Sequence, residues 1–260
     1  MESLFIPIEQ FQLYLIVLSR VAGFFSAIPV FSSGQNPAQI KVGLSVMIAL
    51  ILFPVMAPSI PVVEFGSVTF LLFMVSEVLL GSLLGLISRM IFTAIEFGAT
   101  VIGYQMGFAA ANVFDPQSER QLSLISQFQN VFAIMIFLAI DGHHIFIQTA
   151  AISYEYLPPG QFNVSGNAIP YLFELSAHMF QIGFQFSAPV LSVLLLSGLS
   201  LGILARIFPQ LNVFMLSFPL NIGISFVVIA LTLSFSAMLI TREFGELTDR
   251  ILTILSYLAH

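Results

Sequence analysis

Long apolar runs separated by short polar breaks dominate the chain. Residues 175–205 and 207–241 hold no Asp, Glu, Lys or Arg, and a single arginine, Arg206, separates the two runs. Since about 20 apolar residues cross a bilayer as a helix, this part of the chain is long enough to cross more than once. The runs exceed the roughly 10 residues of a membrane-spanning strand and lack a period of two. The pattern therefore predicts an all-α integral membrane protein.

Proline, glycine and polar clusters mark the ends of the expected helical segments. Pro54, Pro189 and Pro219 are expected to kink or break the helices that contain them. About six to eight membrane crossings follow from the lengths of the apolar segments. The segments cover residues 11–31, 40–57, 65–88, 90–111, 122–140, 145–156, 171–206 and 207–240, and a short amphipathic tail follows.

The composition supports one membrane domain over the whole length. Hydrophobic residues make up 58% and charged residues 8%, with a mean hydropathy of +1.02. The net charge of −6 is scattered, and no basic run indicates nucleic acid. Without cysteine there is no disulfide and no thiolate metal site. Because Glu2 stands in residues 1–7 and no basic residue does, we expect no cleaved signal peptide.

Small residues recur at the four-residue spacing that lets helices approach closely. Two uses of this spacing are open: packing within the chain, or contact with other subunits. The absence of Trp, beside 28 Phe and 6 Tyr, is unusual for a protein that faces lipid all round, because Trp and Tyr normally mark the membrane interfaces. The glycine pairs are Gly81 with Gly85, Gly103 with Gly107, and Gly198 with Gly202.

Charged groups inside apolar runs are costly, and they are usually paired or functional. Either a proton relay or ion pairing that fixes the register between subunits would explain them. We favour pairing, because the carboxylates do not cluster in sequence. A polar stripe on the run 171–206 is expected to face a wet channel or a polar neighbouring helix. The charged positions are Arg20, Glu77, Arg89, Glu96, Asp141, Glu174 and Arg206, and the stripe is His178, Gln181, Gln185 and Ser192.

A polar turn, Asp141-Gly142-His143-His144, interrupts the apolar run that begins at residue 122. Adjacent residues of a helix project in different directions, so the two histidines are not expected to form a ligand pair. We therefore expect no metal here. The ordinary interpretation is a turn at a membrane boundary in which Asp141 or a histidine caps the adjoining helix.

The stretch 104–121 changes from small and apolar to polar, and Pro116 disfavours helical geometry at Asp115. It is either a connecting loop or a re-entrant loop in a pore. In a pore, Met and Phe would form a deformable seal, because Met repacks easily and apolar constrictions can gate by dewetting. Walker A, G-x-S-x-G, H-E-x-x-H and Rossmann motifs are all missing from the sequence. We therefore expect neither an enzyme nor a cofactor.

An ordered set of short motifs runs through the chain. Gly-Tyr-Gln-Met-Gly at 103–107 leads to Phe-Asp-Pro at 114–116, and Asp-Gly-His-His at 141–144 precedes Ser153 and Leu-Pro-Pro-Gly at 157–160. Ala-Arg-Ile-Phe-Pro-Gln-Leu-Asn-Val-Phe at 205–214 precedes Phe-Pro-Leu at 218–220. The set resembles the FliR family of type III export-gate subunits, whose relatives also serve injectisomes. The resemblance extends over essentially the whole chain.

The resemblance implies a fold of broken helical hairpins, with a FliP-like N-terminal part and a FliQ-like C-terminal part whose boundary is uncertain. One such subunit would join about five FliP and four FliQ subunits in a helical hetero-oligomer that exports unfolded rod, hook and filament proteins. It would also meet FlhB, FlhA, the MS ring, the proximal rod and membrane lipids. The assembly would lie in the bacterial inner membrane at the flagellar basal body, with its core raised toward the periplasm.

The resemblance also assigns residues to roles. The pore plug would consist of Met106, Gly107, Phe108, Ala110, Val113 and Phe114, with Asn112, Asp115 and Pro116 shaping its polar return. The resemblance assigns Arg206, Pro209, Gln210 and Asn212 to subunit packing. The four-residue spacing, and not the resemblance, adds Gly81, Gly85, Gly103, Gly198 and Gly202 to the residues expected to pack against other subunits.

Two other classes of protein fit parts of the sequence. A proton-coupled carrier of small molecules would use Glu77, Glu96, Glu174 and His178, although no cluster of charged groups forms a visible substrate pocket. A purely structural membrane scaffold is the third alternative.

Overall fold

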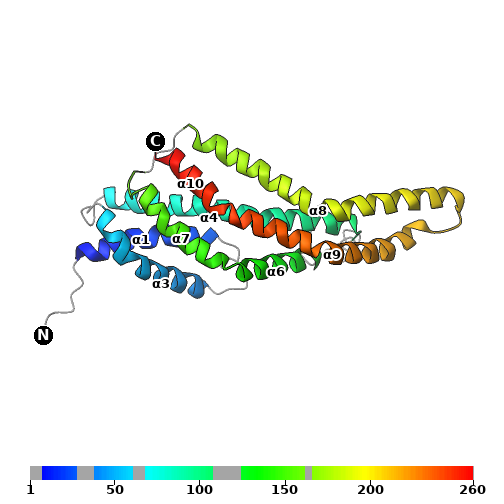
Figure 1. Ribbon diagram of the computed structural model, residues 1–260, viewed down its shortest axis with the longest axis horizontal. Coiled ribbons are helices and arrows are strands. Elements are labelled where there is room, and N and C mark those ends of the chain that lie inside the picture. The colour runs from blue at the N-terminus through cyan, green and yellow to red at the C-terminus, as the bar shows by residue number, and fades with distance from the viewer. Residues whose placement is uncertain (1–7, 28–37, 61–67, 108–123, 162–165, 260) are drawn as a thin grey trace. The chain divides into compact units, whose positions relative to one another are not determined.

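A computed structural model describes residues 8–27, 38–60, 68–107, 124–161 and 166–259. Within these ranges all regular structure is helical, which confirms the predicted all-α fold. The α-helices, labelled in Figure 1, are α1 (Ile8–Ala27), α3 (Ala38–Met56), α4 (Val68–Gln105), α6 (Leu124–Ala139), α7 (Gly142–Tyr156), α8 (Ala168–Ile207), α9 (Val213–Gly245) and α10 (Leu247–Leu258). A 3-10 turn, η1 (Ala57–Ser59), follows α3.

The described residues hold fewer candidate membrane spans than the apolar runs predict. Four helical stretches are long and apolar enough to cross a bilayer, and the bent pair α6–α7 is a fifth candidate. Two of the expected segments join through Arg89 into the 38-residue helix α4, because one charged side chain interrupts hydropathy without breaking backbone hydrogen bonds. Likewise α8 continues through Pro189 and α9 through Pro219.

One of two compact units comprises residues 1–90, 141–175 and 244–260. In this unit 1, α1 packs against α3, and α7 packs against α10. Phe24 of α1 meets Phe146 of α7 edge to face, with ring centroids 5.8 Å apart. Helix α10 is the amphipathic tail that the sequence predicts. Its buried face consists of Leu247, Ile251, Ile254, Leu255 and Leu258.

Helices α1 and α4 cross with their backbones in close contact. A Cβ atom added to Gly81 would overlap the carbonyl oxygen of Arg20, and one added to Gly85 would lie 2.5 Å from the carbonyl oxygen of Phe24. No side chain could move aside to relieve either overlap, because the obstructing atoms are backbone. This glycine pair therefore packs within the chain, which differs from its assignment to subunit packing.

Unit 2 comprises residues 91–140 and 176–243. Its described elements are the second half of α4, α6 and most of α8 and α9. The ring of Phe97 on α4 meets two rings of α8 edge to face, those of Phe180 at 5.3 Å and Phe184 at 5.5 Å. The apolar core of this unit contains Ile102, Met106, Ile125, Val190, Leu194 and Ile229.

Both units contain residues from each half of the chain, so they do not coincide with an N-terminal and a C-terminal part. The division into a FliP-like part and a FliQ-like part stays a prediction.

The α1–α4 crossing makes a prediction for Gly81. Replacing Gly81 by alanine should lower the stability of the full chain by about 1–3 kcal/mol, the usual cost of overpacking, because two backbones must separate. Thermal unfolding in detergent, followed by helical circular dichroism, measures this change. Gly43→Ala is the matched control, since Gly43 lies in α3 with open space at its Cβ position. There alanine should raise stability by up to about 1 kcal/mol. Equal unfolding temperatures for the two variants would contradict the crossing.

Candidate functional site

A buried ion pair lies in unit 1 between two charges that the sequence places inside apolar runs. Nε of Arg20 on α1 donates to Oε2 of Glu77 on α4 at 2.6 Å. The two side chains are 2% and 1% exposed. The structure thus confirms that these charges are paired, but the pair fixes the register of two helices within this chain and not the register between subunits.

The other guanidinium donors of Arg20 bind the C-terminal end of α7. Nη1 donates to the carbonyl oxygen of Ser153 at 3.0 Å, and Nη2 donates to the carbonyl oxygen of Leu157 at 3.0 Å. The carbonyl oxygen of Ser153 also accepts from the N–H of Leu157 at 3.0 Å, and a positive charge at the C-terminal end of a helix is favoured by the helix dipole. Arg20 therefore joins α1, α4 and α7 at one point.

Tyr154 completes the surroundings of the guanidinium group. Its ring lies 4.1 Å from Cζ of Arg20, a cation–π contact, and its hydroxyl donates to the carbonyl oxygen of Val17 at 3.0 Å. No sequence pattern singles out Tyr154, Ser153 or Leu157 as partners of Arg20. The number of donors does indicate that further partners are needed: a buried guanidinium has five N–H groups, and one carboxylate cannot accept them all.

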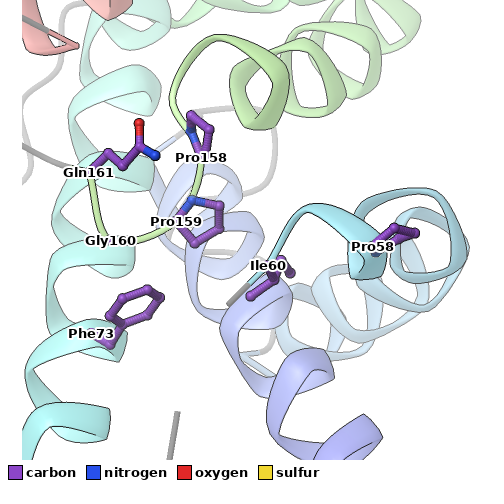
Figure 2. Close-up of a pocket in the computed structure, with 7 residues that line it drawn as sticks. All are labelled: Pro58, Ile60, Phe73, Pro158, Pro159, Gly160 and Gln161. Atoms are coloured by element: carbon purple, nitrogen blue, oxygen red, sulfur yellow. The ribbon is translucent and has the colours of Figure 1, made fainter. Parts of the chain in front are cut away.

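The Pro-Pro-Gly turn that follows Leu157 forms one wall of a hollow in unit 1. Figure 2 shows the turn above the ring of Phe73, which comes from α4. The hollow has a volume of about 500 Å³. Apart from Gln161, its lining offers no polar side chain, so it does not have the convergent polar groups of a catalytic pocket. It is lined by Pro58, Ile60, Phe73, Pro158, Pro159, Gly160 and Gln161.

A second contact between titratable groups lies in unit 2. Nε2 of His178 on α8 is 3.1 Å from Oε2 of Glu243 on α9. His178 is one of the polar-stripe residues, whereas Gln181 and Gln185 are exposed. Of the other predicted charges, Arg89, Glu174 and Arg206 are exposed and Glu96 is half-buried. Glu243 was missed because it follows the apolar run, in a segment expected to be a tail.

The end of α4 anchors the start of the predicted plug. Met106 is fully buried in the apolar core of unit 2, and its assignment to the plug stays a prediction. Gly107 has a φ of +94°, which favours glycine, and the ring of Phe218 fills the space where a Cβ would stand. The rest of the predicted plug lies outside the described residues: Phe108, Ala110, Asn112, Val113, Phe114, Asp115 and Pro116.

The connection between α8 and α9 carries several residues assigned to packing. Pro209, Gln210 and Asn212 are exposed. Oδ1 of Asn212 accepts a hydrogen bond from the backbone N–H of Met215 at 3.2 Å, so this side chain caps the first turn of α9. Gly198 and Gly202 have open space where a Cβ would stand, unlike Gly81 and Gly85, while Gly103 is buried.

The polar turn before α7 differs from the expectation. Asp141 has a left-handed backbone, with a φ of 55°, and its side chain makes no capping hydrogen bond. Its carbonyl oxygen accepts from the N–H of His144 at 2.8 Å instead. The rings of His143 and His144 do not diverge, since their centroids lie 4.3 Å apart. Ideal helical directions fail here because the turn starts from a left-handed residue.

The fold and composition define an all-helical integral membrane protein. Comparison with known proteins adds the family: residues 11–247 match the family described as "Bacterial export proteins, family 1". The chain is 35% identical to the flagellar biosynthetic protein FliR of Bacillus subtilis over 243 residues, 92% of each chain. It is 29% identical to FliR of Escherichia coli K12, over 95% of this chain and 94% of that one. Against FliR of Aquifex aeolicus the identity is 27%, over 92% of each chain.

The chain therefore belongs to the FliR family of bacterial export proteins. It is a membrane component of the flagellar export apparatus.

The buried ion pair makes a prediction for Glu77. Glu77→Gln removes the charge that compensates Arg20, and breaking a buried pair in this way costs about 3–5 kcal/mol of folding stability. Thermal unfolding of the full chain in detergent measures the loss. Glu155→Gln makes the same chemical change at an exposed position of α7 and should stay within about 0.5 kcal/mol of the parent.

A double variant separates the cost of an unpaired buried charge from the loss of the ion pair itself. Arg20→Met with Glu77→Leu removes both charges and should be more stable than Glu77→Gln, because no unpaired charge is left in the interior. If Glu77→Gln and Glu155→Gln unfold at the same temperature, the buried pair does not carry the stability assigned to it.

Proposed function

We propose that this chain is the FliR-type subunit of the flagellar type III export gate, a protein without catalytic activity. One copy would assemble with about five FliP and four FliQ subunits into the channel that passes unfolded rod, hook and filament proteins. The observation that carries the proposal is the family match over residues 11–247, together with relatives named as flagellar biosynthetic proteins. FlhB, FlhA, the MS ring and the proximal rod are its further proposed neighbours.

The anchored end of α4 supports a plug in that channel. A seal must hold its position under load, yet it must also yield when a substrate passes. Met106 is buried in the core of unit 2, and Gly107, with a φ of +94°, lies against the ring of Phe218. The residues that follow, with Phe108 and Phe114 among them, would then supply the apolar constriction.

Exposed apolar faces of α8 and α9 support assembly with other helices. Gly198, Gly202 and Gly223 have open space at their Cβ positions, so a partner helix can approach the backbone there. With no Trp to mark a lipid interface, these faces fit protein neighbours better than bulk lipid. We place the assembly in the inner membrane at the basal body, with its core raised toward the periplasm. The exposed apolar side chains of α8 and α9 include Leu195, Leu196, Leu199, Ile203, Met215 and Leu231, each more than half exposed.

The carrier alternative named Glu77 among its four residues. Glu77 lies 2.6 Å from Nε of Arg20, and it is 1% exposed. The contact gives this carboxylate a structural role, because it compensates the charge of a buried arginine.

Native mass spectrometry of the tagged chain, co-expressed with FliP and FliQ and extracted in mild detergent, tests the assembly. We expect one copy of this chain with about five and four copies of the two partners, as the family resemblance implies. Gly198→Leu with Gly202→Leu should reduce the yield of the complex, because leucine fills the space left for a partner helix. Gly166→Leu, at an open position in a turn outside the helices, is the control. A monomer or homodimer without the partners would overturn the proposal.

Ion leakage through the assembled complex tests the plug. Phe108→Ala with Phe114→Ala should raise ion conductance across a membrane containing the complex, because a wider and less apolar constriction stays hydrated. Phe173→Ala, which removes an exposed aromatic ring from α8 outside the plug, should leave conductance unchanged. Unchanged leakage and unchanged flagellar export in the double variant would show that these residues do not form the seal.

A further inference from the structure

Three side chains of the types that ligate metal ions lie close together at the start of α7. Asp141, His143 and His144 each offer one ligand atom, and these atoms all lie within 4.8 Å of one another. Nδ1 of His144 is 3.9 Å from Oδ1 of Asp141, and both side chains are more than two-thirds exposed. In the part of the chain that the structure describes, no other group of His, Cys, Asp and Glu residues meets this condition.

The local structure does not otherwise explain this arrangement. Asp141 adopts a left-handed backbone, which is unusual for a residue other than glycine, yet its side chain caps nothing. Nδ1 of His143 is buried and has no hydrogen-bond partner, which is costly for a polar atom.

The chemistry of the ligands selects the class of ion. Two imidazole nitrogens and one carboxylate oxygen suit borderline divalent metals, and zinc binds both ligand types at about 2.0–2.2 Å. Ligands at that distance lie about 3.3 Å apart around a tetrahedral ion. The exposed side chains of Asp141 and His144 can close the remaining gap by rotating about their own bonds.

We propose that Asp141, His143 and His144 form a binding site for a divalent transition-metal ion, of which zinc is the representative probe. This site replaces the expectation that the turn binds no metal, which rested on divergent histidine directions. The carboxylate of Asp141 offsets part of the charge of the ion, which matters because the positive end of the α7 dipole lies at the same place. Three protein ligands leave a fourth position for water.

A metal bound at this site would stabilise the conformation of the turn before α7. A metal bridging Asp141 to His143 and His144 ties the left-handed residue to the first turn of α7, and so holds the helix start in this conformation. The proposal does not depend on the export role, because it rests on residues at the surface of unit 1 alone.

Zinc binding by the full chain tests the site directly. The protein is purified in detergent with a tag that contains no histidine, and it is titrated with zinc against a chromogenic chelator. We expect one saturable equivalent per chain. Asp141→Asn and the double variant His143→Gln with His144→Gln should each weaken binding about tenfold or more, the scale on which ligand shells affect affinity. Asparagine suits the first position because it tolerates the left-handed backbone.

Matched controls separate this site from general binding to the surface. His178→Gln removes a histidine from unit 2, and Glu155→Gln removes an exposed carboxylate from α7; both should bind zinc like the parent. Elution of all variants at the same volume in gel filtration confirms that they are folded. Binding that is unsaturable, that survives the double histidine replacement, or that is unaffected by Asp141→Asn would overturn the proposal.

Discussion

An arginine in an apolar interior must find a partner for its charge and for its donors, and unit 1 is arranged around that requirement. Removing an ion from water costs several kcal/mol even after the protein relaxes. Glu77 compensates the charge of Arg20, the end of α7 accepts two more hydrogen bonds, and Tyr154 covers the guanidinium plane. Because these partners come from α4 and α7 and Arg20 itself comes from α1, satisfying one side chain sets the register of all three helices. The pair need not be a large source of net stability to have this effect, since its main penalty falls on arrangements that leave it broken.

The close crossing of α1 and α4 belongs to the same constraint. Gly81 follows Glu77 by four residues, so both lie on the face of α4 that meets α1. The absence of a side chain at Gly81 lets the backbones touch, and touching backbones put the guanidinium within 2.6 Å of the carboxylate. The Pro-Pro-Gly turn then starts from Leu157, whose carbonyl Arg20 holds, and it covers Phe73 of α4 (Figure 2). The Arg20–Glu77 ion pair, the close crossing at Gly81 and the Pro-Pro-Gly turn therefore stabilise one another within unit 1.

The exposed apolar surfaces of this chain indicate where partner subunits would pack. Unit 2 contains an ordinary apolar core, yet α8 and α9 also carry many exposed apolar side chains and glycines with open space beside them. For a member of the FliR family these features fit a subunit of a larger helical assembly. The polar turn at Asp141 is of another kind, since the side chains of Asp141 and His144 are exposed, that of His143 is half-buried, and all three converge.

The sequence alone determined the all-α membrane fold, the costly charges at Arg20 and Glu77, and the family, because hydropathy, charge and ordered motifs are local properties of the chain. The number of spans was not determined in this way, since Arg89 and Pro189 interrupt a pattern without interrupting a helix. Tertiary structure alone decided that Arg20 pairs with Glu77 in the same chain, that Gly81 faces α1 while Gly198 faces open space, and that the rings of His143 and His144 lie together. The physical reason is distance along the chain and backbone direction: partners 57 residues apart, or a turn begun by one left-handed residue, leave no local trace in the sequence.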